Sequence, residues 1–318
     1  VVVGVYNPVT PAGLFKLNYR MHDKYVIVDD EMYLLGGRNS NDIFLGDYTT
    51  DINVDRDILV WDITKGEGES LQELETYFRQ IWNEDCVQIK GGRKKNSSDI
   101  SVSEEASDDS EGAESNSKNS NIVNGIPNVE NEITDETQEK LSKYEKQYQS
   151  LEMRYASLKE KYTDIEDYSS WQEDTIPANK ITLVNNGTHA GPKTPLVLQT
   201  IRYLAQNAEN VTIQTPYVIC NGYMYDTLNE IASHAQLKII LNAVEKGSNP
   251  WGCTDYLNQK KKILNTGADV YELMNEVPVH TKAVLLDDRL SVVGSYNLDM
   301  RSTYLDTELM LVIDSKEL

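Results

Sequence analysis

The sequence contains the same spaced set of residues twice, and this duplication limits the folds that the chain can adopt. Each copy reads His, any residue, Lys, four residues and Asp, then six residues before a Gly, with an Asn three positions after that Gly. Two of the four histidines in the chain begin a copy. This repeated spacing predicts two related lobes, each presenting one His and one Lys. The first copy comprises His22, Lys24, Asp29, Gly36 and Asn39, and the second comprises His280, Lys282, Asp287, Gly294 and Asn297.

Length and charge narrow the class of protein. The 318 residues, 39% of them hydrophobic, are enough for one large domain or two ordinary ones. A net charge of −21 argues against a nucleic-acid partner bound through a general basic surface. The charge is uneven, because 96–174 holds 20 acidic and 7 basic side chains, or −13 of the total. The rest of the chain is therefore only mildly acidic.

Cysteines and apolar runs exclude other classes. Cys86, Cys220 and Cys253 are few and widely spaced, so neither a disulfide framework nor a zinc site is expected. The sequence has no apolar run of about 18 residues and no signal-peptide pattern at its start. Val1 to Tyr6 predicts a buried strand that begins without a preceding element, and only 21 residues precede the first motif. We therefore expect a fragment that lacks the opening of its first lobe.

Hydrophobic periodicity predicts an α/β protein with two pseudo-symmetric lobes, each a mixed sheet flanked by helices. The predicted domains are a first lobe over 1–90, an acidic disordered linker over 91–135, an amphipathic helix over 136–170 and a second lobe over 171–318. In the first lobe we expect a hairpin over 24–35, a strand over 57–61 and a helix over 70–82. In the second we expect strands over 181–184, 211–218, 237–243, 269–273, 290–294 and 308–313, and helices over 195–205, 223–235 and 255–266.

A heptad pattern marks the expected amphipathic helix. Apolar and tyrosine side chains alternate spacings of three and four residues over about three heptads, with charged residues between them. Packing of this seam against the rest of the chain is the favoured interpretation, while pairing with a second copy and contact with a membrane remain alternatives. The seam comprises Leu141, Tyr144, Tyr148, Leu151, Tyr155, Leu158 and Tyr162.

The two motifs can together form a phosphate site. Residues two apart on a strand point to the same face, so each His projects beside its Lys, and two such pairs can line one pocket. Lysine charge, the amides of Asn39 and Asn297, and backbone N–H groups at the turns around Gly37 and Ser295 would hold an anion. One imidazole could then attack phosphorus while the other protonates the departing oxygen. Tyr217, at the end of a predicted strand, could line this pocket or serve packing alone.

A histidine nucleophile needs an acceptor on its second ring nitrogen. We expect Glu308, on the strand after the second motif, to orient His280, and Asp57, after the first, to orient His22. The predicted catalytic set includes the motif aspartates, although their odd offset favours a structural role. This set is His22, Lys24, Asp29, His280, Lys282 and Asp287.

These residues resemble the phospholipase D superfamily. The resemblance rests on the paired His-x-Lys-x4-Asp runs together with Gly36-Gly37-Arg38-Asn39 and Gly294-Ser295-Tyr296-Asn297. The first of these glycine runs, with 304–308 (Tyr-Leu-Asp-Thr-Glu), is similar to bacterial cardiolipin synthases and their close relatives. The likeness covers both lobes but not the acidic segment.

The resemblance implies a phosphohistidine mechanism that uses no metal or other cofactor. His22 would be the nucleophile and His280 the acid, or the reverse. A phosphatidyl group from phosphatidylglycerol or phosphatidylethanolamine would move to a lipid alcohol, at a bacterial cell membrane to which the protein binds peripherally or through a segment outside this chain. Hydrolysis by water is the alternative, a nuclease is less favoured, and a non-catalytic scaffold that binds anionic lipid is a fourth class. The oligomeric state is left open.

Overall fold

The structure is a computed structural model, and it describes residues 1–46, 49–64, 66–91, 135–164, 166–167 and 169–318. The chain divides into two compact units, one formed by Val1–Gly92 with Thr175–Leu318 and the other by Arg93–Asp174. The first unit contains both motifs, so the site is built within one body.

The second unit contains the helix that the heptad pattern predicted. Its described elements are α3 (Asp135–Lys161) and α4 (Ser169–Glu173). The partner of the heptad seam stays a prediction, as do the ranges of the four predicted domains. The predicted acidic linker falls almost wholly on 92–134, outside the described residues. None of the helices described in either unit is long and apolar enough to cross a membrane.

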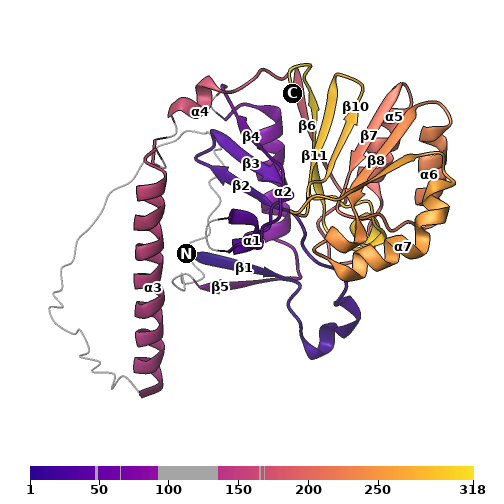
Figure 1. The fold of residues 1–318 in the computed structure, drawn as a ribbon. Helices are drawn as coiled ribbons and strands as arrows, with labels where there is room; N and C mark the ends of the chain where they lie inside the picture. The colour runs from indigo at the N-terminus through magenta and orange to yellow at the C-terminus, as the bar shows by residue number, and fades with distance from the viewer. Residues whose placement is uncertain (47–48, 65, 92–134, 165, 168) are drawn as a thin grey trace, which may run out of the picture. The chain divides into compact units, whose positions relative to one another are not determined.

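The second lobe is built on a mixed seven-stranded sheet (Figure 1). In spatial order its strands are β6 (Lys180–Asn185), β12 (Leu309–Asp314), β11 (Leu290–Gly294), β10 (Ala283–Leu286), β7 (Asn210–Gln214), β8 (Gln236–Asn242) and β9 (Asp269–Leu273). The run β7, β8, β9 is parallel and the other pairs are antiparallel. The helices are α5 (Leu196–Ala205), α6 (Gly222–Ala232), α7 (Pro250–Leu264) and α8 (Met300–Tyr304), with a 3₁₀ turn at Val244–Lys246. These elements confirm the strands and helices predicted for this lobe to within a few residues.

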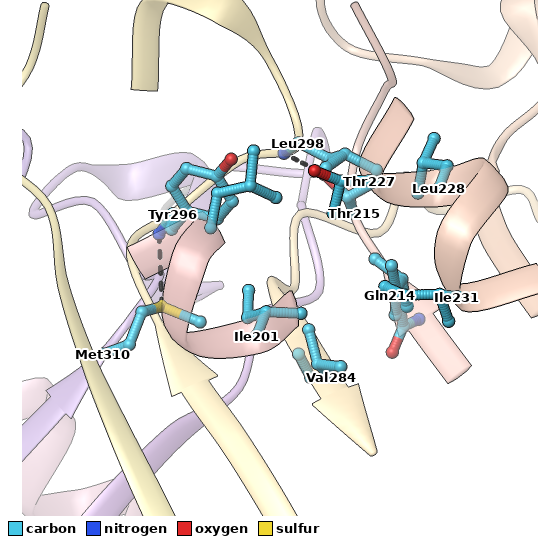
Figure 2. A pocket seen from close by; sticks show the side chains of 13 residues that line it. Ile201, Gln214, Thr215, Thr227, Leu228, Ile231, Val284, Tyr296, Leu298 and Met310 are labelled. Carbon is cyan, nitrogen blue, oxygen red and sulfur yellow. Dashed lines mark hydrogen bonds between the residues drawn. The ribbon is translucent and has the colours of Figure 1, made fainter. Parts of the chain in front are cut away.

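Alternation along the strands creates the core of this lobe. In β8, Leu237, Ile239 and Leu241 are buried on one face. On that face they join apolar residues spaced three and four apart on α5 and α6, including Ile201 and Ile231. Figure 2 looks into a gap of about 10 Å³ between these helices and the sheet. The gap has room for no more than about one water molecule, so it is a packing defect within the core.

The described part of the first lobe carries an antiparallel three-stranded sheet. Its strands are β2 (Tyr25–Val28), β3 (Met32–Gly36) and β4 (Asp57–Trp61), and its helices are α1 (Asp42–Leu45) and α2 (Glu69–Trp82). A 3₁₀ helix occupies Pro11–Lys16. The predicted buried strand at the start forms as β1 (Val2–Tyr6), but it pairs with β5 (Val87–Gly91) in a separate two-stranded sheet. Val1, Val2 and Val3 are exposed, so the prediction of burial was wrong.

Strand β12 joins the two lobes, because its two faces serve different cores. Met310 contributes to the core of the second lobe. Leu309, Leu311 and Ile313 point the other way, into a second cluster with β3 and α2 of the first lobe. Each of these three side chains is at most 2% exposed, and burial of one such side chain stabilises a fold by roughly 1.5–3 kcal/mol. Hydrophobic packing therefore fixes one lobe against the other.

A glycine at the end of β11 tests this packing. A Cβ added at Gly294 would lie 2.2 Å from the carbonyl oxygen of Leu309 and 2.9 Å from Cα of Met310. We expect Gly294→Ala to lower the free energy of unfolding by about 1–3 kcal/mol, because backbone atoms of β12 would have to move. Urea denaturation followed by circular dichroism measures the loss. Gly222→Ala is the matched control, because a Cβ there meets nothing within 4 Å; equal stability of the two variants would contradict the packing.

Candidate active site

The first motif histidine is held by a carboxylate of the opposite lobe. Nδ1 of His22 lies 3.0 Å from Oε1 of Glu308, which is fully buried. The backbone of the same segment adds two contacts, since Thr307 N donates to the carbonyl of Arg20 at 2.9 Å and His22 N donates to the Thr307 hydroxyl at 3.2 Å. The Nε2 edge of His22 is thereby left as its reactive position.

The second motif histidine is held in the same crossed manner. Nδ1 of His280 lies 2.7 Å from Oδ2 of Asp55 in the first lobe. Val54 N donates to the carbonyl of Pro278 at 2.9 Å, and His280 N donates to the carbonyl of Val54 at 2.7 Å. The Phe44 ring packs edge-on against the imidazole, with centroids 4.8 Å apart. Each lobe therefore supplies the carboxylate that orients the histidine of the other.

This arrangement corrects the predicted pairings. Glu308 was expected to orient His280, but it contacts His22. Asp57 was expected to orient His22, but its carboxylate bonds Arg38, with Oδ2 accepting from Nε at 2.6 Å. Both predictions assumed that each lobe completes its own histidine, and that assumption was wrong.

The strand register explains why Asp57 was the wrong choice. Gly36 in β3 is paired with Asp57 in β4, whereas the corresponding Gly294 in β11 is paired with Met310 in β12. Asp57 therefore occupies the place of Met310. The carboxylate two positions earlier, Asp55, occupies the place of the glutamate that holds the other histidine. A two-residue offset keeps both aspartates on one side of the strand, so sequence alternation could not separate them.

The two lysines lie beside their histidines, as predicted. Lys24 donates to the carbonyl of His22. Lys282 donates to the carbonyl of His280, and its Nζ lies 2.6 Å from Nδ1 and 3.0 Å from Nε2 of that ring. Burial lowers the pKa of both ammonium groups, that of Lys282 to about 7. The carboxylates of Glu308 and Asp55 oppose this effect of burial, and two cations placed in one site are suited to a bound anion.

Both imidazoles are neutral near pH 7. Burial, followed by the charges of Lys24 and Lys282, lowers the pKa of His22 to about 3. Burial also lowers the pKa of His280, to about 4, although the hydrogen bond with Asp55 acts in the opposite direction. Lys282 of one lobe depresses the pKa of His22 of the other, and the two histidines also interact, so both motifs share one electrostatic environment.

The two orienting carboxylates differ in charge. Burial raises the pKa of Glu308 to about 7. Burial alone would also raise the pKa of Asp55, but the hydrogen bond with His280 and the charge of Lys282 hold it below its ordinary value. Asp55 is therefore a full carboxylate at neutral pH, whereas Glu308 is protonated in part of the population. This difference distinguishes two histidines that otherwise occupy matching positions.

The turns predicted to bind phosphate have another role. The hydroxyl of Ser295 donates to Glu308, and a Cβ at Gly37 would lie 2.6 Å from the Asp55 carboxylate. The backbone N–H groups at both turns already donate to carbonyls, from Gly37 to Arg56 at 3.3 Å and from Ser295 to Leu309 at 3.0 Å. Ser295 and Gly37 thus support the orienting carboxylates, and phosphate contact at these two positions stays a prediction.

Asn297 is placed firmly beside the second motif. The amides on either side of it are anchored in the core, where Tyr296 N donates to Sδ of Met310 at 3.4 Å and Leu298 N donates to the Thr215 hydroxyl at 3.3 Å (Figure 2). The side chain is 4% exposed, and its Oδ1 has no hydrogen-bond partner among the described residues. An acceptor held unpaired in this way is suited to a ligand group that donates a hydrogen bond, such as a hydroxyl.

Asn39 lies where two hollows meet. One hollow, of about 190 Å³, adjoins His280 and combines asparagine side chains with apolar ones such as Phe44. The other, of about 390 Å³, adjoins Lys24 and is lined mainly by apolar side chains, among them Phe78. Asn39 lines both hollows. The phosphate binding predicted for Asn39 and Asn297 remains a proposal.

The motif aspartates lie away from the histidines. Asp29 and Asp287 take left-handed backbone conformations, with φ of 50° and 51°, at the hairpin turns. Oδ1 of Asp287 accepts from the amides of Glu209 at 3.0 Å and Asn210 at 2.8 Å. These contacts agree with the structural role that their odd offset favoured and not with membership of the catalytic set.

Three contributors were missed by the sequence analysis. Asp55 orients His280, Phe44 packs against that ring, and Arg38 donates both to Asp57 and, at 3.1 Å, to the carbonyl of Asp55. Two aspartates, Asp55 and Asp57, precede the apolar residues of a strand, and they were a usable signal for Asp55. The contact of Phe44 with His280 depends on tertiary structure. Among the described residues, no group of three or more His, Cys, Asp or Glu is arranged to hold a metal ion.

The fold and the paired motifs resemble those of the phospholipase D superfamily. Residues 200–318 match the family described as "Cardiolipin synthase, PLD-like domain". The matched segment, which lies within the second lobe, is thus similar to a phospholipase D-like domain of the cardiolipin synthase type.

Curated relatives and a solved structure agree with this class. The chain is 32% identical over 124 residues to cardiolipin synthase A of Buchnera aphidicola, covering 37% of this chain and 24% of the relative. It is 33% identical over 122 residues to cardiolipin synthase A of Yersinia pseudotuberculosis, covering 37% and 23%. The matched segment thus spans about a quarter of these relatives. The phosphatidylserine synthase of Haemophilus influenzae is similar in fold, with a TM-score of 0.51, 14% identity, and coverage of 93% of this chain and 58% of that one.

The pairing of Asp55 with His280 predicts a selective change in titration. Asp55→Asn removes the interaction that raises the pKa of His280, so this pKa should fall below about 4. Ring NMR of the labelled histidines follows the titration. Asp57→Asn is the matched control two residues away, and it should leave the His280 pKa unchanged. If Asp57→Asn lowered the His280 pKa and Asp55→Asn left it unchanged, Asp57 would be the orienting carboxylate.

Anion binding should be coupled to proton uptake. Because the pKa values of His22 and His280 are about 3 and 4, both rings are neutral at pH 6 in the free protein. A neighbouring anion favours the imidazolium form and raises these pKa values, so the complex binds more protons and its affinity rises as pH falls. Titration calorimetry with tungstate in two buffers of different ionisation enthalpy measures the uptake.

The double variant His22→Asn with His280→Asn is the control for that titration. The double variant retains the lysines and Glu308, so the difference in proton uptake between it and the unaltered protein is due to the histidines. A binding enthalpy that does not depend on the buffer in the unaltered protein would contradict proton uptake.

Proposed function

We propose that this chain carries the catalytic centre of a phosphatidyltransferase of the cardiolipin synthase type. The observation that carries the proposal is the crossed pair of histidines, each held through Nδ1 by a carboxylate of the other lobe, beside the buried Lys282 and the half-buried Lys24. Two oriented imidazoles of separate function are what a two-step transfer at phosphorus requires.

The difference between the carboxylates supports a division of labour. Asp55 is ionised and favours the imidazolium form of His280, which suits a general acid. Burial raises the pKa of Glu308, so this carboxylate favours the imidazolium form of His22 less, which suits a nucleophile that must be unprotonated. We therefore assign the attack to Nε2 of His22 and the proton transfer to Nε2 of His280.

The proposed reaction has two balanced steps. Nε2 of His22 forms a bond to phosphorus as the bond to the first alcohol oxygen breaks, and protonated His280 gives its proton to that oxygen. A second alcohol then gives its proton to His280 as its oxygen bonds to phosphorus and the phosphorus–nitrogen bond breaks. Lys24, Lys282 and the two asparagine amides would hold the phosphate oxygens throughout.

The two hollows at Asn39 support an amphipathic substrate. A phospholipid diester has apolar chains on one side of phosphorus and a polar head group on the other. The surface of the hollow beside Lys24 is mainly apolar, with contributions from Met21, Leu34 and Phe78, whereas the hollow beside His280 has polar and apolar surface in nearly equal parts. This asymmetry favours a lipid over a nucleic-acid backbone, and so a site of action at a membrane surface.

Lipid product analysis tests the proposal. Given phosphatidylglycerol vesicles, the protein should form cardiolipin. His22→Ala should abolish product, and His280→Ala should lower the rate by roughly 10²–10⁴-fold, as loss of a general acid does. His189→Ala, at an exposed position outside both motifs, is the control and should retain full activity. Formation of phosphatidic acid alone would favour a hydrolase, and cleavage of DNA without action on lipid would favour a nuclease.

A modified leaving group separates the roles of the two histidines. A phosphatidyl ester of p-nitrophenol releases an anion that needs no proton, so the first step no longer depends on the acid. His280→Asn should release a burst of nitrophenolate and accumulate phosphohistidine, which rapid quenching followed by mass spectrometry detects. His22→Asn should show no burst. A burst in His22→Asn and none in His280→Asn would reverse the assignment.

A further inference from the structure

The hollow beside His280 is a separate compartment of the site. It is lined by both lobes, from the segments around Asn41 and Asn53 in the first and from the loops that follow β7 and β8 in the second. Its volume of about 190 Å³ holds a small head group but not acyl chains. We name it the amide pocket, after its asparagines, which are Asn39, Asn41, Asn53, Asn242 and Asn249; Tyr217 and Ser248 also line it.

The amide pocket contains no permanent charge of its own. Among the described residues that line it there is no Asp, Glu, Lys or Arg, in a chain in which these make up 25% of residues. Burial raises the pKa of the Tyr217 phenol and of the Cys253 thiol, so both stay neutral. A ligand that carries an ammonium or carboxylate group would be desolvated here without a counter-charge.

The polar groups of the pocket are held in place by the fold. Oδ1 of Asn249 accepts from the amide of Gly252 at 3.2 Å and caps α7. The Tyr217 ring packs against the same glycine, where an added Cβ would lie 2.9 Å from the ring. Asn53, 8% exposed, reaches across the lobes to the Ser248 hydroxyl at 3.4 Å. This last bond is long, so a ligand hydroxyl could replace it at low cost.

We propose that the amide pocket binds the polar alcohol that leaves from or attacks phosphorus beside His280, and that it selects an uncharged polyol over an amine-bearing alcohol. The proposal rests on the proposed function. Amide and hydroxyl side chains both donate and accept, so they satisfy the hydroxyl groups of glycerol. An ethanolamine ammonium group finds only neutral acceptors there. Asn53 and Ser248, one from each lobe, are the specificity-determining residues.

A competition experiment tests this selection. Phosphatidylglycerol vesicles are incubated with equal concentrations of free ¹³C-glycerol and ethanolamine, and labelled phosphatidylglycerol and phosphatidylethanolamine are quantified together. A change in the catalytic steps that both acceptors share alters both products equally, so it does not alter the ratio of the two products. The unaltered protein should favour glycerol. Asn53→Asp should shift the ratio roughly tenfold toward ethanolamine, because one charge-assisted hydrogen bond is worth about a factor of ten or more.

Two further variants make the test decisive. Ser248→Asp places the same charge on the opposite wall at an exposed position and should shift the ratio in the same direction, even if Asn53→Asp fails to fold. Asn258→Asp, exposed on α7 and outside the pocket lining, adds equal charge and should not shift it.

The outcomes separate this inference from the function on which it rests. Transfer to both acceptors with a ratio that neither pocket variant changes, or a preference for ethanolamine in the unaltered protein, would overturn the amide pocket while leaving the transferase standing. Absence of any phosphatidyl transfer, including cardiolipin formation, would overturn both.

Discussion

The crossed hydrogen bonds between histidine and carboxylate are the constraint on which the site depends. His22 is held by Glu308 and His280 by Asp55, so neither lobe contains a complete site. Backbone bonds accompany both pairs, and an apolar cluster shared by β3, α2 and β12 holds the lobes together. Packing between the lobes is therefore a requirement of the chemistry as well as of stability.

Matching positions in the two lobes do not produce matching electrostatics. Asp55 is shorter than Glu308 by one methylene group, and Gly37 leaves room for it where Ser295 donates to the longer side chain. The shorter carboxylate has a pKa below its ordinary value, while burial raises that of the longer one to about 7. Small differences in side-chain length and burial can thus give carboxylate partners of different pKa to two histidines that the sequence presents as equivalent.

Local sequence patterns predicted many of the strands, helices and motif residues, but they did not predict which residues pair across the two lobes. Alternation and helical spacing located β8 and α5, and the repeated motif located both His and Lys pairs. The sequence could not reveal that Glu308 turns toward the other lobe, because such a contact depends on how the sheets pack. Nor could it distinguish Asp55 from Asp57, since two positions on one strand face differ only in register.

Strand β12 carries a consequence for how this fold tolerates change. Its alternate residues enter two different cores, and the residue immediately before it, Glu308, reaches the histidine. If β12 paired with β11 one residue out of register, Leu309 and Met310 would exchange the cores that they face, and the Glu308 carboxylate would no longer reach His22. Insertions and deletions should thus be far rarer in this short segment than elsewhere, because one strand register determines both the packing of the two lobes and the orientation of the His22 ring.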